Sequence, residues 1–413
     1  MNDSLLIFVA LLPLSAMGFS DTLVGQFLSR RDLPYPVSDQ TATPLGDAIY
    51  LAGGCSKDQQ FDEGSGFYYC PETTKRFLAY FPNTDSYMNL PDMPRARCRH
   101  TAAQALGKIF VFGGRDDADS IVDAIDVYDP ATNAWTTLGT KLAATTSDAA
   151  AVAPHSDEVL IVGGYDASYT ASNATVRFVP STGASEMAAA HLATSRGDIG
   201  AALSCSGSQM CVFGGFTHEN GFSAPLPTVE CLDLKTERWS VVEAPANIAR
   251  GDKGFVQLHC RYYVFGGENP NHGTMDDVEV LDGERWRQVG RMASRRFRYA
   301  AARFGDDAFL FGGQRDLVGG TYGEAGTYYP LVSSVEQYRE SLRDWNVVMN
   351  VEAATLRLDR LDDQYDDIDT GIAKAALGFA IVGCFIALAA FMKKPGKSAA
   401  TRGGHGELEV TTI

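Results

Sequence analysis

Phe110-Val111-Phe112-Gly113-Gly114 is an apolar run that closes on a pair of glycines, and the same pattern recurs along the chain. The six pairs are Gly53-Gly54, Gly113-Gly114, Gly163-Gly164, Gly214-Gly215, Gly266-Gly267 and Gly312-Gly313. Successive first glycines are 60, 50, 51, 52 and 46 residues apart. A self-similar unit with a period of roughly 50 residues indicates a repeat architecture, in which each unit packs on its neighbours.

A second marker follows most of the glycine pairs. An aromatic or apolar residue precedes a second aromatic residue by seven positions in Tyr80–Tyr87, Tyr128–Trp135, Leu232–Trp239 and Tyr338–Trp345. In the fifth repeat the interval is five, from Leu281 to Trp286, and in the third Ser185 follows Phe178 in the tryptophan position. All four tryptophans therefore occupy one position of the repeat.

An apolar strand, a glycine pair, a tyrosine and a tryptophan at fixed spacing resemble the kelch repeat. The resemblance covers residues 21–350 and implies an all-β fold, a six-bladed β-propeller with four strands in each blade. Stacking the blades radially would bury faces that one blade cannot bury alone. Glycines suit a strand end where two backbones approach closely. The alternative is a sandwich of unrelated strands.

Closure of the ring is left open by the sequence. Residues 21–45 could supply a closing strand, because Phe27 lies 26 residues before Gly53, as Tyr87 lies 26 before Gly113. Trp345, however, already predicts an outer strand for the sixth blade within its own repeat.

The two ends of the chain predict a single-pass type I membrane protein of the secretory pathway or cell surface. Residues 1–20 have the apolar core of a signal peptide, although an uncleaved anchor is the alternative. An acidic stalk is expected over 351–370, a transmembrane helix over 371–392 and a cytosolic tail over 393–413, with a buried core helix as the alternative to the span. The last residues, Thr411-Thr412-Ile413, resemble a weak PDZ ligand.

The charge balance and the cysteines restrict the partners and the compartment. Thirty-five basic residues stand against 51 acidic ones, a net charge of −16, so nucleic acid is not an expected partner. An oxidising compartment favours disulfides, and the expected pairs are Cys55–Cys70, Cys205–Cys211 and Cys231–Cys260, with Cys98 left over. Asn173 begins the sequon Asn-Ala-Thr and is a candidate glycosylation site.

Arginines at one position of the repeat suggest a ligand-binding rim. Arg97, Arg250 and Arg296 each lie 16 residues before the first glycine of their repeat, with Arg95, Arg99, Arg295 and Arg298 close by. Arginines in comparable positions of kelch adaptors contact acidic peptides, so the resemblance implies a carboxylate-binding rim. The alternative is structural: the arginines could tie loops to backbone carbonyls.

No catalytic constellation emerges from the sequence. His218 and His272 follow glycine pairs and could bind copper on one rim, as in the related galactose-oxidase-like enzymes, but no matching tyrosine and cysteine motif accompanies them. Six-bladed kelch enzymes also include sialic-acid mutarotases and specifier proteins. The sequence therefore predicts a binding propeller for a protein or glycan, with no cofactor; the alternative is a copper oxidoreductase or a sugar-modifying enzyme.

Overall fold

The computed structural model describes residues 22–63, 67–219, 222–243, 245–283 and 285–343, which belong to one compact unit, Asp21–Arg343. These residues form antiparallel sheets, and six of the sheets have four strands each. The all-β fold predicted from the repeats is thus confirmed for the described part of the chain.

Each blade is one four-stranded sheet. In blades one to five the strands follow chain order from the innermost to the outermost, whereas the outermost strand of blade six comes from the N-terminal end of the described chain. Blades one to three are β2 (Thr41–Leu45), β3 (Ala48–Ala52), β6 (Phe77–Phe81), β7 (Ser86–Asn89); β8 (Thr101–Ala105), β9 (Lys108–Phe112), β10 (Ala124–Asp129), β11 (Ala134–Lys141); and β12 (Ala150–His155), β13 (Glu158–Val162), β14 (Thr175–Val179), β15 (Ala184–Met187). Blades four to six are β16 (Gly200–Leu203), β17 (Gln209–Phe213), β20 (Val229–Asp233), β21 (Arg238–Val242); β22 (Gly254–Leu258), β23 (Arg261–Asn269), β24 (Gly273–Asp282), β25 (Arg285–Arg291); and β26 (Ala300–Phe304), β27 (Asp307–Phe311), β29 (Val335–Arg343), β1 (Thr22–Arg30).

The innermost strands form a closed ring. Each of β2, β8, β12, β16, β22 and β26 contacts the next, and β26 contacts β2. A ring of this kind removes the exposed sheet edge at the centre.

Smaller sheets extend the connections that follow the glycine pairs. A three-stranded sheet joins β4 (Gln59–Asp62) and β5 (Phe67–Tyr69) of the first repeat to β28 (Tyr328–Tyr329) of the sixth, and β18 (Phe216–Glu219) pairs with β19 (Phe222–Pro225). We call the rim that carries these connections the loop face. In every blade a β-bridge joins the segment after the glycine pair to the segment before the innermost strand.

The glycine pairs hold each blade to the next. All twelve glycines have positive φ. The second glycine of every pair donates its backbone N–H to a carbonyl of the following blade, as Gly114 does to Thr146 at 2.9 Å. A Cβ on Gly113 would lie 2.1 Å from that same carbonyl oxygen. Both the left-handed backbone and the close approach therefore demand glycine.

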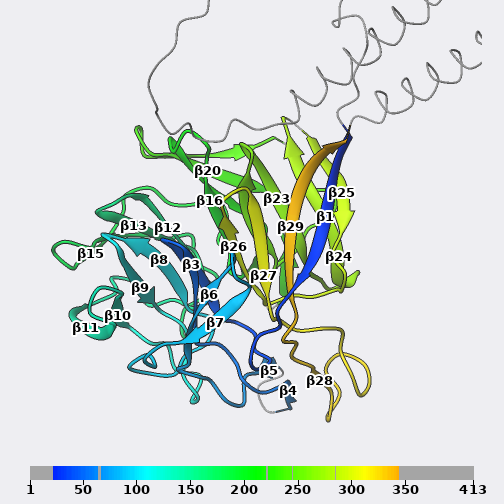
Figure 1. Cartoon of the computed structure of the whole chain (residues 1–413), viewed down its shortest axis with the longest axis horizontal. Coiled ribbons are helices and arrows are strands. Elements are labelled where there is room, and N and C mark those ends of the chain that lie inside the picture. Colours follow the sequence, from blue (N-terminus) through cyan, green and yellow to red (C-terminus); the bar gives the residue numbers. More distant parts are fainter. Residues whose placement is uncertain (1–21, 64–66, 220–221, 244, 284, 344–413) are drawn as a thin grey trace, which may run out of the picture. The chain divides into compact units, whose positions relative to one another are not determined.

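The two residues that mark the second motif of the repeat lie opposite each other on the two outer strands of a blade. Tyr128 lies opposite Trp135, and Leu232 lies opposite Trp239. In the sixth blade Phe27 on β1, and not a residue of the sixth repeat, lies opposite Tyr338. Figure 1 shows β1 in blue beside β29 in orange, so the N-terminal strand closes the ring. Trp345 lies outside the described residues.

Three disulfides are present among the described residues. Cys55–Cys70 is as predicted, and Cys98 is free and buried. The predicted Cys205–Cys211 pair is wrong, because Cys205 lies in the turn between β16 and β17 and bonds to Cys260 in the matching turn of blade five. The predicted Cys231–Cys260 pair is also wrong, because Cys231 bonds to Cys211, its direct cross-strand partner.

The predicted signal peptide, stalk, membrane span, tail and PDZ-like terminus lie outside the described residues. Within residues 22–343, leaving aside 64–66, 220–221, 244 and 284, no helix is long and apolar enough to cross a membrane.

Candidate functional site

The arginines predicted to form a ligand-binding rim are interior residues. Arg97, Arg250 and Arg296 are fully buried. Each donates from Nη1 to the carbonyl of the first glycine of its own blade, at 3.0–3.2 Å. Their own backbone carbonyls accept the glycine N–H of the preceding blade. The rim hypothesis is therefore wrong for these three residues, because their guanidiniums are enclosed by acceptors of the protein itself.

A buried carboxylate neutralises each of these arginines. Arg97 pairs with Asp126, and Arg296 pairs with Glu336. Arg250 bonds to Asp277 at 2.7 Å and to Glu279 at 2.9 Å. Burial lowers the pKa of Arg97 to about 10, opposed by the charge of Asp126. These pairs fix the segments that precede the innermost strands β8, β22 and β26.

A fourth buried arginine of this kind was not predicted from the sequence. Arg196 is fully buried, donates to Gly214 at 3.2 Å and pairs with Glu230 at 2.5 Å. It lies 18 rather than 16 residues before its glycine. The tripeptide Arg-Gly-Asp at 196–198 repeats at 250–252, and this identity was the signal that could have revealed it.

One position per blade, two residues after the buried-arginine position, lines the propeller axis. Its six residues all have positive φ, and we call them the axial ring: Asp39, Arg99, Asp148, Asp198, Asp252 and Arg298. Each donates its backbone N–H to the carbonyl of the preceding member, at 2.8–3.2 Å, so that the hydrogen bonds run around the whole ring. Six side chains from six distant segments are thereby brought to one place.

The axial ring holds four carboxylates and two guanidiniums. Arg298 donates to Asp252 at 3.2 Å and lies 4.0 Å from Asp39. Arg99 lies 3.9 Å from the same carboxylate of Asp39. The carboxylate oxygen Oδ2 of Asp148 is buried and has no hydrogen-bond partner within the described part of the chain. The ring is thus acidic on one side and ion-paired on the other.

Acid groups on the axis titrate near neutral pH. Burial raises the pKa of Asp148 to about 6. Burial, as the main cause, and the charge of Asp252, as the second, raise the pKa of Glu268 to about 8. Glu268 is held against the ring because its backbone pairs with Gly251 in both directions, at 3.0 and 3.1 Å.

Aromatic side chains stand beside the axial ring on the loop face. We call Phe61, Tyr68, Tyr322 and Tyr329 the tyrosine cluster; their rings surround Tyr68 with centroids 4.8–5.3 Å apart. The cluster is tied to the axis through its backbone and through β4. Arg99 donates to the carbonyl of Tyr68 at 3.5 Å, and Arg298 donates to Gln59 at 2.6 Å. Tyr322 is 68% exposed, the most of any large hydrophobic residue described.

The remaining predicted site residues are dispersed. Arg298 belongs to the axial ring, whereas Arg95 is a half-exposed residue bonded to Asp126 and Thr137 in blade two. Asn173 is exposed, and its amide donates to the carbonyl of Leu192 at 3.3 Å; its glycosylation stays a prediction. The side chain of His218 lies outside the described part of the structure.

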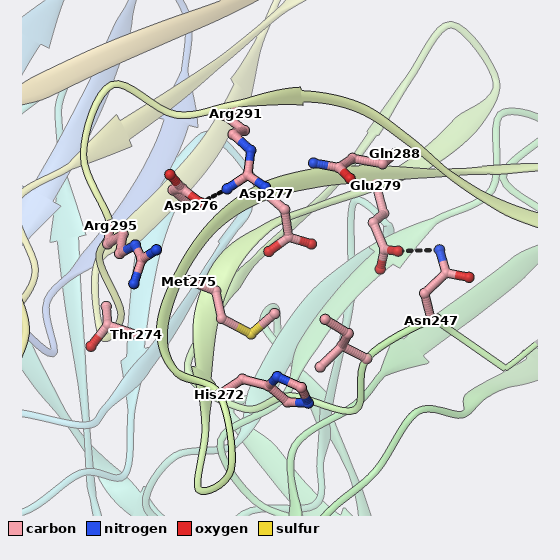
Figure 2. A pocket seen from close by; sticks show the side chains of 11 residues that line it. Asn247, His272, Thr274, Met275, Asp276, Asp277, Glu279, Gln288, Arg291 and Arg295 are labelled. Carbon is pink, nitrogen blue, oxygen red and sulfur yellow. Dashed lines mark hydrogen bonds and ion pairs between the residues drawn. The ribbon is translucent and has the colours of Figure 1, made fainter.

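His272 lines a pocket of about 390 Å³ on blade five (Figure 2). The pocket is also lined by Asp276, Asp277 and Glu279 of β24, and by Arg291 and Arg295. Among the described residues, no group of three or more histidine, cysteine, aspartate or glutamate side chains is placed to hold a metal ion. The structure does not bring His272 together with a second histidine in the described part.

Comparison with known proteins gives matches of several kinds. A family model described as "Kelch motif" matches residues 96–141 and 200–245. The N-acetylneuraminate epimerase of Pasteurella multocida is 30% identical over 138 residues, 32% of each chain. The Kelch-like protein terF of Aspergillus terreus is 23% identical over 319 residues, 73% of this chain and 65% of that protein. The chain thus spans about a third of the first relative and just under two thirds of the second.

The solved structure of YjhT has the same fold. It superposes with a TM-score of 0.57 at 15% identity, over 73% of this chain and 96% of that chain. At this identity the likeness concerns the fold alone.

Proposed function

From the premise that this chain belongs to the kelch repeat family, we propose that its propeller is a binding module that captures a partner protein on the loop face. One observation carries the proposal: the tyrosine cluster presents Tyr322 to solvent, and Tyr68 at its centre is hydrogen-bonded through its backbone carbonyl to Arg99 of the charged axial ring. Exposed aromatic anchors next to arginines are typical of the residues that dominate the binding energy of protein interfaces.

Two further apolar side chains are exposed on or beside the small sheet that supports the cluster. Tyr69 of β5 and Val318 of the sixth repeat are both 40% exposed. Val318 exchanges backbone hydrogen bonds with Tyr328 of β28, which pairs with β4. The exposed residues therefore stand on one small sheet that the first and sixth repeats share, and this sheet gives them a rigid support.

We also propose that residues 371–392 anchor this module as a type I membrane protein with the propeller outside the cytosol. The disulfides Cys55–Cys70, Cys205–Cys260 and Cys211–Cys231 support this orientation, because disulfides persist in oxidising compartments. Extraction of cell membranes at alkaline pH tests the anchor, since release of the full chain into the supernatant would contradict it.

Replacement of Tyr322 by alanine is expected to weaken partner binding by about 30-fold, because an aromatic anchor in a hot spot contributes about 2 kcal/mol or more. Crosslinking of the full chain at the cell surface, followed by quantitative mass spectrometry, compares the partner recovered by each variant. The matched control is Met88→Ala on β7, which is 48% exposed and lies outside the loop face. Equal recovery by both variants would contradict the proposal.

A sugar-modifying enzyme is the second candidate. It is favoured by the match to a protein named N-acetylneuraminate epimerase, together with axial carboxyl groups whose pKa values differ. Between pH 6 and 8, Asp148 is ionised and Glu268 is protonated, so one group can accept a proton and the other can donate one.

If the chain is such an enzyme, its epimerisation rate is expected to rise as pH increases through about 6 and to fall above about 8. Glu268→Gln cannot donate the proton and should lower the rate at least ~100-fold. Proton NMR of N-acetylneuraminate mixed with the full chain measures the rate. A rate equal to that of buffer alone at every pH would exclude this candidate without affecting the binding proposal.

A further inference from the structure

The pocket on blade five is separate from the axial ring and the tyrosine cluster, and it contains no residue of either. Its walls come from β24 and β25, from the turn between β23 and β24, and from the loops that precede β22 and β26. Figure 2 shows the side chains that line it. The volume of about 390 Å³ is in the range of small-molecule sites.

Positive and negative charges balance around this pocket. Asp276 pairs with Arg291 at 2.8 Å, and the buried Arg250 behind the wall pairs with both Asp277 and Glu279. Three carboxylates thus share two guanidiniums. Arg295, which is exposed and has no ion pair among the described residues, supplies the third positive charge.

Several polar groups of the pocket remain available to a ligand. The side chains of Arg295, Gln288 and His272 make no hydrogen bond within the described part of the chain. Asp277 lies across from Arg295 in Figure 2, between Met275 and Arg291. Donors and acceptors therefore face the same space, and Met275 and Ile248 contribute an apolar surface to it.

We propose that this pocket binds an uncharged sugar ring, such as one monosaccharide unit of a glycan. Hydroxyl groups both donate and accept hydrogen bonds, which matches a lining of arginine, amide, imidazole and carboxylate groups. An anionic ligand would face three carboxylates already fixed in place, and a cationic ligand would face Arg295. The electrically balanced lining therefore favours a ligand without charge.

Saturation-transfer NMR of the full chain tests this site, in a detergent without a sugar headgroup. The probes are D-glucose, D-galactose, D-mannose and N-acetyl-D-glucosamine, with D-glucuronate and D-glucosamine as charged comparators. At least one uncharged sugar is expected to bind. Arg295→Gln should weaken that binding about tenfold, the loss of one charge-assisted hydrogen bond.

Arg285→Gln is the matched control. Arg285 is an exposed arginine of β25, a strand that contributes to the pocket, but Arg285 itself does not line the pocket. Arg285→Gln should leave sugar binding unchanged, as should Tyr322→Ala, so that this site and the proposed protein-binding face fail or succeed independently. Preference for glucuronate or glucosamine, equal binding by the Arg295→Gln variant, or no signal from any uncharged sugar would overturn the proposal.

Discussion

Replacement of Arg250 by methionine is expected to lower the free energy of unfolding by about 3–5 kcal/mol. The variant keeps an unbranched, flexible side chain but leaves the carboxylates of Asp277 and Glu279 without their shared cation. It also removes the hydrogen bond to the carbonyl of Gly266. Chemical denaturation of the full chain, followed by tryptophan fluorescence, measures the loss.

The loss should depend on pH in a defined direction. Burial raises the pKa of Glu279 above its ordinary 4.5, and the charge of Arg250 opposes that rise. Without Arg250 the folded-state pKa rises further above the unfolded value. A raised carboxyl pKa favours the folded state below the unfolded pKa and loses that contribution as pH rises, so the variant's loss of stability should grow as the pH rises above the ordinary carboxyl pKa of 4.5.

Arg285→Met is the control, since Arg285 is exposed on β25. The same experiment separates the two interpretations of the buried arginines. A variant at Arg250 that folds as stably as the unaltered protein and has lost only its ligand would restore the rim hypothesis.

Replacement of Phe27 by alanine is expected to destabilise the propeller by about 2–3 kcal/mol, less than a fully buried phenylalanine because Phe27 is partly exposed. Its ring packs 5.1 Å from Tyr338 and 6.4 Å from Phe265 of blade five. Phe27 therefore holds the closing strand both within blade six and against the neighbouring blade. Thermal unfolding of the full chain measures the effect.

Gln26→Ala is the control for this prediction, because Gln26 lies next to Phe27 on β1 and is exposed. If Phe27→Ala were no more harmful than Gln26→Ala, then β1 would not be needed to close the ring. That result would return the outer strand of blade six to the residues around Trp345.

The sequence by itself determined the repeat and therefore the fold. A glycine pair after an apolar strand has a local cause, because only glycine takes the left-handed backbone and permits the carbonyl of the next blade at Gly113. The interval of seven between Tyr128 and Trp135 is equally local, since a hairpin of that length sets the two opposite each other. Such signals survive in a linear sequence because each is complete within one repeat.

The candidate site depended on contacts between repeats. Arg97 and Arg298 are both arginines in the segment before an innermost strand, two positions apart in register. Arg97 is buried behind the glycine pair. Arg298 lies on the axis, because its left-handed backbone turns the chain there between two blades. The offset from the glycine pair separates the two positions, but nothing in the local sequence shows which of them is buried and which lies on the axis.

Ring closure and disulfide pairing were decided in the same way. Phe27 and Tyr338 lie at opposite ends of the described chain, and Cys205 meets Cys260 only because two blades place equivalent turns side by side. The axial ring likewise needs one residue from each of six blades. The repeat depends on residues that are close together in the sequence and can be predicted from them. Ring closure, the disulfide between blades and the axial ring involve residues that come together only when the blades assemble into a ring.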